Sequence, residues 1–139
     1  MLNETLRLAP AVPVDPKVAL ADDVLPGSGV RVRKGDNVEW SAWNIHRRPE
    51  YFGADAEQFR PERWLEDSAL PKTNRPPFVP FQFGPRTCLG MRMALVDMTA
   101  ALFVLARRFR FESVGFKPLL DITLSLSMEQ VRVRVVVRK

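Results

Sequence analysis

The longest regular pattern of apolar positions in the chain lies between residues 89 and 108. Its apolar side chains recur at helical spacing: Leu89, Met93, Val96, Ala100, Phe103 and Val104. Few polar residues interrupt the segment, so it is apolar around almost its whole circumference. A helix with this pattern is typically buried. We therefore predict one long core helix over residues 89–108.

Shorter alternating patterns predict strands on both sides of this helix. Residues 30–33 and 38–41 alternate and are joined by a turn signal, Lys34-Gly35-Asp36-Asn37. Residues 122–126 and 131–135 alternate as well. The four residues between these last two runs are expected to form the turn of a C-terminal β-hairpin.

The rest of the chain has a less regular pattern. Residues 1–8 are expected to form the end of a helix, because Leu2, Leu6 and the stem of Arg7 lie near one face. Three prolines between residues 10 and 16 predict an extended connection. Residues 42–80 are rich in prolines, charges and aromatic side chains without a sustained period, which indicates a long ordered meander. The fold class we predict is mainly α with small β-sheets (α+β), in a single unit over residues 1–139.

Composition narrows the class of protein further. Of the 139 residues, 46% are hydrophobic, which excludes a disordered composition. No apolar run reaches the length of about 18 residues that a membrane span needs, and the first residues lack the pattern of a signal peptide. The single cysteine excludes an internal disulfide, and one cysteine with one histidine cannot complete a structural zinc site.

The net charge of +5 leaves two interpretations open. The basic residues are scattered and accompany no nucleic-acid-binding motif, so we expect no nucleic-acid partner. They either form a solvated basic surface or dock an acidic protein partner, and Arg92, Lys72 and Arg75 are candidates for such docking.

Residues 81–90 carry the candidate chemistry. Cys88 lies at the start of the predicted core helix, where the positive end of the helix favours a thiolate. Gly84 and Gly90 permit close approach of the backbone, and Arg86 can reach a nearby anion. A thiolate beside a cation on a glycine-lined loop suits a haem, which carries an iron and two propionates. The alternative is that Cys88 is an ordinary buried cysteine.

The same loop resembles a known family. Phe81, Gly84, Arg86, Cys88 and Gly90 complete the pattern Phe-x-x-Gly-x-Arg-x-Cys-x-Gly, which is similar to the cysteine-ligand loop of the cytochrome P-450 family. Two further signatures occur in the family's order, Glu-x-x-Arg at residues 4–7 and Pro-Glu-Arg-Trp at residues 61–64. The resemblance covers essentially the whole chain.

The resemblance implies a role for each of these residues. Cys88 would be the axial ligand of haem b (iron protoporphyrin IX), Phe81 would shield the sulfur, and Arg86 would pair with a propionate. Lys17 lies where related proteins often use an arginine for a propionate. Glu4, Arg7 and Arg63 would form a buried structural network, and His46 would be structural. The alternatives are ordinary core packing for Phe81, a plain surface arginine at position 86 and a surface ion pair between residues 4 and 7.

The resemblance also implies a function, that of a monooxygenase that inserts one oxygen atom from O2 into an apolar organic substrate. Similarity to fungal members suggests fatty acid or alkane hydroxylation. Ala11, Val12, Pro13 and the hairpin near Leu124 would then lie beside the substrate, and the alternative for them is ordinary packing. Electrons would come from an NADPH-dependent reductase, and no residue of the chain beyond the haem ligand is expected to be catalytic.

Full-length relatives would lie on the cytosolic face of the endoplasmic reticulum membrane, held there by an N-terminal anchor. This chain shows neither anchor nor signal and is expected to be cytosolic. We expect it to be the C-terminal haem-binding part only, inactive alone as a fragment. A non-catalytic haem-binding remnant and a small basic interaction protein without haem remain as alternatives.

Overall fold

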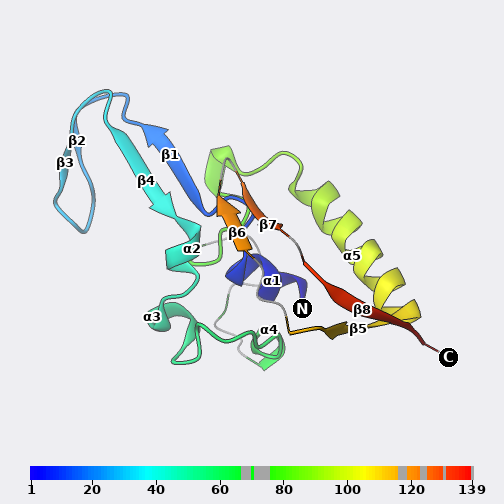
Figure 1. The fold of residues 1–139 in the computed structure, drawn as a ribbon. Helices are drawn as coiled ribbons and strands as arrows, with labels where there is room; N and C mark the ends of the chain where they lie inside the picture. The colour runs from blue at the N-terminus through cyan, green and yellow to red at the C-terminus, as the bar shows by residue number, and fades with distance from the viewer. Residues whose placement is uncertain (67–69, 71–75, 116–118, 123–124, 130, 139) are drawn as a thin grey trace.

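A computed structural model describes residues 1–66, 70, 76–115, 119–122, 125–129 and 131–138 of the chain. Helices and small antiparallel sheets alternate along it, so the predicted α+β class is confirmed (Figure 1). The helices are α1 (Leu2–Leu8), α2 (Ala42–Ile45), α3 (Pro49–Phe52), α4 (Arg63–Glu66), the 3-10 turn η1 (Gly84–Arg86) and α5 (Met91–Arg108). The strands are β1 (Val14–Val18), β2 (Asp23–Val24), β3 (Arg31–Val32), β4 (Asn37–Ser41), β5 (Phe109–Ser113), β6 (Leu119–Ile122), β7 (Leu126–Glu129) and β8 (Val133–Val137).

The first four strands form an extended arm (Figure 1). β1 pairs with β4, and β2 pairs with β3 farther out. The runs predicted at 30–33 and 38–41 do lie on either side of one turn, as β3 and β4, but the two strands pair with β2 and β1 and not with each other. The turn residues bond instead to the end of β1, since the N–H of Gly35 donates to the carbonyl of Ala19 at 2.8 Å. This bond brings β4 alongside β1, and β3 pairs with β2 instead.

The C-terminal strands pair antiparallel, but the predicted pairing of residues 122–126 with residues 131–135 is wrong. Residues 127–129, expected as the turn between these runs, lie in β7, which pairs with β6. β8 pairs with β5, the strand that directly follows α5. Alternation of side chains identifies a strand but carries no information on its partner. The backbone N–H of Leu126 also donates to the carbonyl of Ala11 at 2.7 Å, which fixes β7 beside the segment after α1.

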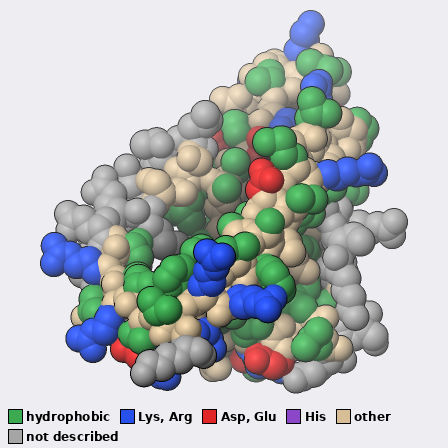
Figure 2. Space-filling model, turned by 90° about the vertical axis from the view of Figure 1, so that its right-hand side faces the viewer, with side chains coloured by type: hydrophobic (Ala, Val, Ile, Leu, Met, Phe, Trp, Pro, Cys, Tyr) green, Lys and Arg blue, Asp and Glu red, His purple; other side chains and the backbone are tan. Residues whose placement is uncertain are grey.

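Helix α5 begins at Met91, close to its predicted start, but it is not a core helix. None of its side chains is buried, and Met93 is 72% exposed. Figure 2 faces this side of the molecule, where hydrophobic side chains are open to solvent. Leu95 and Met98 alone pack partly against the core. An apolar circumference predicts that a helix can be buried, whereas the actual burial depends on elements packed around it.

The core lies between α1 and the meander. Its apolar cluster consists of Leu6, Phe52, Ala56, Trp64, Leu70 and Phe78. The largest fully buried side chains are mostly polar, among them Arg7, Arg63, His46 and Glu4. None of the helices in the described part of the chain is both long and apolar enough to cross a membrane.

Candidate functional site

A buried ionic network joins α1 to α4. Glu4 and Arg7 lie one helical turn apart, so their side chains meet on one face of α1. Arg7 donates to both carboxylate oxygens of Glu4, from Nη2 at 2.8 Å and from Nε at 2.9 Å. Arg63 donates from Nε to the same carboxylate at 3.0 Å. The structure therefore brings together the three residues that the resemblance places in one network, and it buries all three.

The carboxylate of Glu4 is the centre of this network. It also accepts from the backbone N–H of Arg60 and from the indole N–H of Trp64, each at 2.9 Å. Burial alone would raise the pKa of Glu4. The hydrogen bonds from Arg7, Arg60 and Trp64, with the charge of Arg7, outweigh burial and lower the pKa to about 2. Glu4 is therefore ionised throughout the physiological range.

The two guanidinium groups extend the network into the meander. Arg7 donates to the backbone carbonyls of His46, Ala56 and Gln58. Arg63 donates to the carbonyl of Phe52 at 2.8 Å and to the carboxylate of Asp55 at 3.1 Å. Burial lowers the pKa of Arg63, but its bonds to Asp55 and Glu4 outweigh burial and raise it. The carboxylates of Glu4 and Asp55 thus face the guanidinium groups of Arg7 and Arg63, and several carbonyl groups of a segment with little regular structure are hydrogen-bonded.

His46 follows α2 and is fully buried. Burial is the main cause of a lowered pKa, about 4, and the charges of Arg7 and Arg47 lower it further. The imidazole is therefore neutral at physiological pH. Its two nitrogens bond the carbonyl of Arg7 and the N–H of Val79.

The loop that carries Cys88 folds back on itself before α5. Gly84 has a positive φ of 69°, a conformation that favours glycine. The N–H of Cys88 then donates to the carbonyl of Phe81 at 2.9 Å. Cys88 is exposed, so it is not an ordinary buried cysteine. A Cβ added at Gly90 would lie 3.9 Å from the sulfur, which is an ordinary van der Waals contact, so Gly90 borders the thiol directly.

The thiol of Cys88 lines a hollow of about 330 Å³. Apolar residues from two segments share this hollow with it, namely Leu6, Ala11, Val12, Val79 and Phe81. Phe81 is partly buried and packs against the core cluster as well. The structure thus places the cysteine loop opposite the residues that follow α1.

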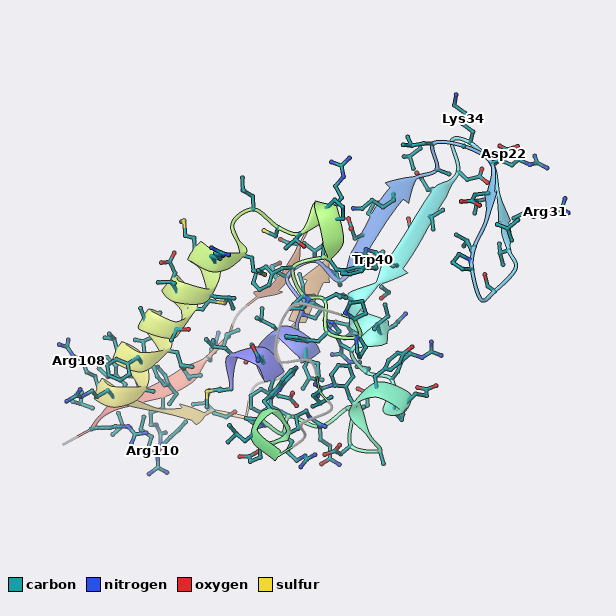
Figure 3. The ribbon with its side chains drawn as sticks, turned by 180° about the vertical axis from the view of Figure 1, so that it is seen from behind. Asp22, Arg31, Lys34, Trp40, Arg108 and Arg110 are labelled. Carbon is teal, nitrogen blue, oxygen red and sulfur yellow. The ribbon has the colours of Figure 1, made fainter. Side chains whose placement is uncertain are left out.

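Both candidate cations for an anionic ligand line a neighbouring hollow of about 280 Å³. Lys17 reaches it from β1 and Arg86 from η1, and Trp40 and Gln82 line both hollows. Trp40 lies near the base of the arm, whereas Asp22, Arg31 and Lys34 lie at its far end (Figure 3). Lys17 and Arg86, far apart in sequence, therefore flank one space beside the cysteine hollow.

Sequence reasoning missed Asp15 in this region. Its carboxylate accepts from Lys17 Nζ at 2.6 Å and from the indole N–H of Trp40 at 3.0 Å. Lys17 also donates to Gln82 at 3.4 Å. Residues 15 and 17 lie two apart in an extended strand and so share a face, which is the signal that could have revealed this pair. The charge of Lys17 is partly neutralised, while Arg86 is exposed.

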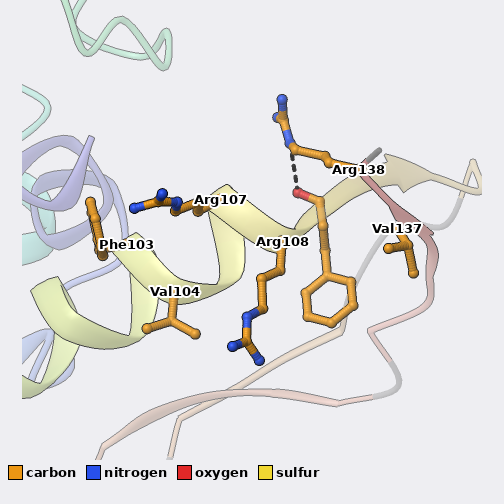
Figure 4. Close-up of a pocket in the computed structure, with 7 residues that line it drawn as sticks. Phe103, Val104, Arg107, Arg108, Val137 and Arg138 are labelled. Atoms are coloured by element: carbon orange, nitrogen blue, oxygen red, sulfur yellow. Dashed lines mark hydrogen bonds between the residues drawn. The ribbon is translucent and has the colours of Figure 1, made fainter.

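A larger hollow of about 570 Å³ lies at the other end of α5. Its lining includes Arg107, Arg108 and Arg138, but these side chains point in different directions (Figure 4). Among the residues that the structure describes, no acid, thiol or histidine lines this hollow. The hollow at Cys88 is therefore the better candidate for chemistry. Lys72, Arg75 and Leu124, for which the sequence suggested partner and substrate contacts, lie outside the described residues.

The residues near Cys88 fit a metal cofactor in which most of the metal's ligands come from the cofactor itself. Within the described residues, no three His, Cys, Asp or Glu side chains gather where they could hold a bare metal ion. A porphyrin already supplies four nitrogens to its iron and needs one strong donor from the protein. An exposed thiol beside an apolar hollow, with two cations nearby, meets that need.

Comparison with known proteins gives a consistent result. A family model described as cytochrome P450 matches residues 1–137. Cytochrome P450 704C1 of Pinus taeda is 44% identical over 84% of this chain and 22% of its own length. Cytochrome P450 704B1 of Arabidopsis thaliana is 42% identical over 85% of this chain and 22% of its own length. Cytochrome P450 52A6 of Candida tropicalis is 42% identical over 85% of this chain and 23% of its own length. The chain thus spans about a fifth of the length of these curated relatives.

Proposed function

Because the chain belongs to the cytochrome P450 family, matching it over residues 1–137, we propose that it is the haem-thiolate part of a monooxygenase, with Cys88 as the iron ligand. The observation that carries this proposal is the exposed thiol of Cys88 beside an apolar hollow. The family's cofactor is haem b. Haem b ligated by a thiolate supplies the chemistry that cleaves the O–O bond of bound oxygen.

The protein's own residues hold this group and control its surroundings. Cys88 supplies the anionic sulfur, and Phe81 limits the access of water to it. Arg86 pairs with a propionate, and Lys17 adds a weaker contribution because Asp15 already holds its ammonium at 2.6 Å. Gly84 and Gly90 leave the loop free of side chains that would compete for this space. The Glu4 network fixes the meander on which the loop depends.

The substrate we propose is an apolar organic molecule, a fatty acid or an alkane, into which one oxygen atom is inserted. Ala11 and Val12 support this class, because they line the cysteine hollow with apolar surface. An NADPH-dependent reductase at the cytosolic face of the endoplasmic reticulum membrane would supply the electrons. Arg92 is exposed on the first turn of α5, close in sequence to Cys88, and suits an acidic partner.

The test is spectroscopic. The purified chain is mixed with haem, reduced and exposed to carbon monoxide, and we expect the red-shifted Soret band of a thiolate-ligated haem. The variant Cys88→Ser should lose this band. The matched control Leu89→Ala, which alters a fully exposed neighbour, should keep it. A chain that binds no haem, or a band that persists in Cys88→Ser, would overturn the proposal.

A second measurement separates an enzyme from a haem-binding remnant. The haem-loaded chain is supplied with NADPH, the reductase and a medium-chain fatty acid or alkane, and hydroxylated product is measured. The thiolate band without product would favour the remnant. The exposed apolar surface of α5 is the observation that favours this second candidate, because water then reaches elements around the site.

A further inference from the structure

We propose that His46 is a positioning residue. Its two ring nitrogens fix the position of the cysteine loop relative to the Glu4–Arg7–Arg63 network. The inference rests on the proposed function, since the position of the loop matters because Cys88 binds iron. His46 itself contacts neither haem nor substrate in this account. It acts through the backbone of Val79, at the start of the segment that leads to the ligand.

The hydrogen bonds of His46 fix one tautomer. The N–H of Val79 can only donate, so Nε2, 3.0 Å away, must carry a lone pair. The carbonyl of Arg7 can only accept, so Nδ1, 3.1 Å away, must carry the proton. The ring is therefore a neutral connector with a donor on the α1 side and an acceptor on the loop side. An imidazolium would place two donors against each other at Val79.

Hydrogen bonds continue from this connector to the ligand. The carbonyl of Val79 accepts from the N–H of Gln82 at 3.2 Å, which closes the turn before the loop. The neighbouring carbonyl of Phe81 accepts from the N–H of Cys88 at 2.9 Å. At the other end, Arg7 Nη1 donates to the carbonyl of His46 itself at 2.7 Å. A displacement of Val79 is therefore transmitted to the backbone of Cys88 through the turn at residues 79–82 and the bond between residues 81 and 88.

Packing holds the imidazole ring in place. Its centroid lies 6.2 Å from that of Phe52 and 5.4 Å from that of Phe78, and the side chain is fully buried. The charged groups that face it are Arg7 and Arg47, and both disfavour a second positive charge there. A lysine could not replace it, because an ammonium has no lone pair with which to accept from Val79.

Two variants test the inference. His46→Phe keeps an aromatic ring of similar size but leaves the N–H of Val79 without its acceptor. His46→Gln keeps an amide oxygen for Val79 and an amide N–H for Arg7, and serves as the conservative rescue. The core variant Leu70→Ala is the matched control, because it lowers stability without removing a bond to the loop.

Amide hydrogen exchange of the chain without haem is the first readout. We expect exchange at Val79, Gln82 and Cys88 to quicken about tenfold in His46→Phe relative to Leu70→Ala at equal global stability, and to return toward the wild-type rate in His46→Gln. Equal rates in His46→Phe and Leu70→Ala would overturn the inference. If His46→Phe does not fold, the exchange rate of the Val79 amide in the wild-type chain tests the inference. A rate equal to that of an unstructured peptide would show that His46 does not fix the position of Val79.

Haem ligation is the second readout. We expect the fraction of thiolate-type spectrum in the reduced carbon monoxide complex to fall in His46→Phe and to recover in His46→Gln, while Leu70→Ala retains it. A wild-type chain without this spectrum would refute the proposed function, and the exchange rates alone would then decide the role of His46. A thiolate spectrum that is intact in folded His46→Phe would overturn the positioning role.

Discussion

Neutralising Glu4 should remove a large part of the stability of the chain. The carboxylate accepts five hydrogen bonds from described residues and is fully buried. In Glu4→Gln the amide keeps the shape but loses the charge, and its NH₂ group faces donors from Arg7 or Trp64. Arg7 and Arg63 would then share one buried region with Asp55 as the remaining anion. Breaking a buried ion pair in this way typically costs about 3–5 kcal/mol.

The pKa of Glu4 gives an independent magnitude. The pKa falls from an ordinary value of 4.5 to about 2 in the folded chain. At about 1.36 kcal/mol for each pKa unit, the ionised carboxylate contributes about 3 kcal/mol at neutral pH. Because the folded pKa is the lower one, this contribution is complete above pH 4.5 and is lost as the pH falls from 4.5 toward 2. The destabilisation caused by Glu4→Gln should therefore shrink across the same window.

The assay is urea unfolding followed by tryptophan fluorescence, since Trp64 is itself part of the network. Wild type and Glu4→Gln are compared at pH 7 and near pH 2.5. The control is Glu57→Gln, which removes a carboxylate that is 76% exposed and 3.4 Å from Arg47, and it should cost less than about 0.5 kcal/mol. A cost below about 1 kcal/mol for Glu4→Gln at pH 7, or an equal cost at both pH values, would refute the reasoning.

Three further predictions follow from the same geometry. The pKa of His46 falls from 6.5 to about 4 on folding, so stability should decline by about 3 kcal/mol as the pH drops through that window, and urea titrations of His46→Gln should lack this decline. Gly84→Ala should cost about 1 kcal/mol in urea unfolding although the space around it is open, because its φ of 69° strains an alanine. Arg86→Ala should weaken haem binding about tenfold in an absorbance titration, while Arg31→Ala, at the far end of the arm, should leave it unchanged.

Local patterns predicted elements well and their partners poorly. The residues of α1 and α5 could be identified because helical periodicity is a property of neighbours in sequence. The exposure of α5 and the pairing of β8 with β5 could not, because they depend on contacts between distant segments. Alternation indicated β3, β4 and β8, but it did not indicate β2 or β5, and it left several partners equally acceptable for the strands that it did indicate.

The same limit applies to the candidate site. The spacing of Glu4 and Arg7 indicated a pair on one helix face, whereas the inclusion of Arg63 was implied only by the family resemblance. The bond between Asp15 and Lys17 was readable in principle from strand alternation. The hydrogen bond from the indole of Trp40 to the carboxylate of Asp15 could not be predicted from the sequence. It requires the register of β1 against β4, in which residues 15 and 40 are opposite each other.

A purely apolar core could not replace the buried network of this chain. Buried ion pairs are often exchanged for hydrophobic residues at little cost when their partners are only each other. Here Arg7 and Arg63 also donate to backbone carbonyls of residues 46, 52, 55, 56 and 58, in a segment where few helical or strand bonds are available. Apolar substitutes would leave these carbonyls buried without donors, each at a cost of about 1–3 kcal/mol. The network therefore supplies the hydrogen bonds that secondary structure would otherwise provide, and the path of the meander toward the cysteine loop depends on it.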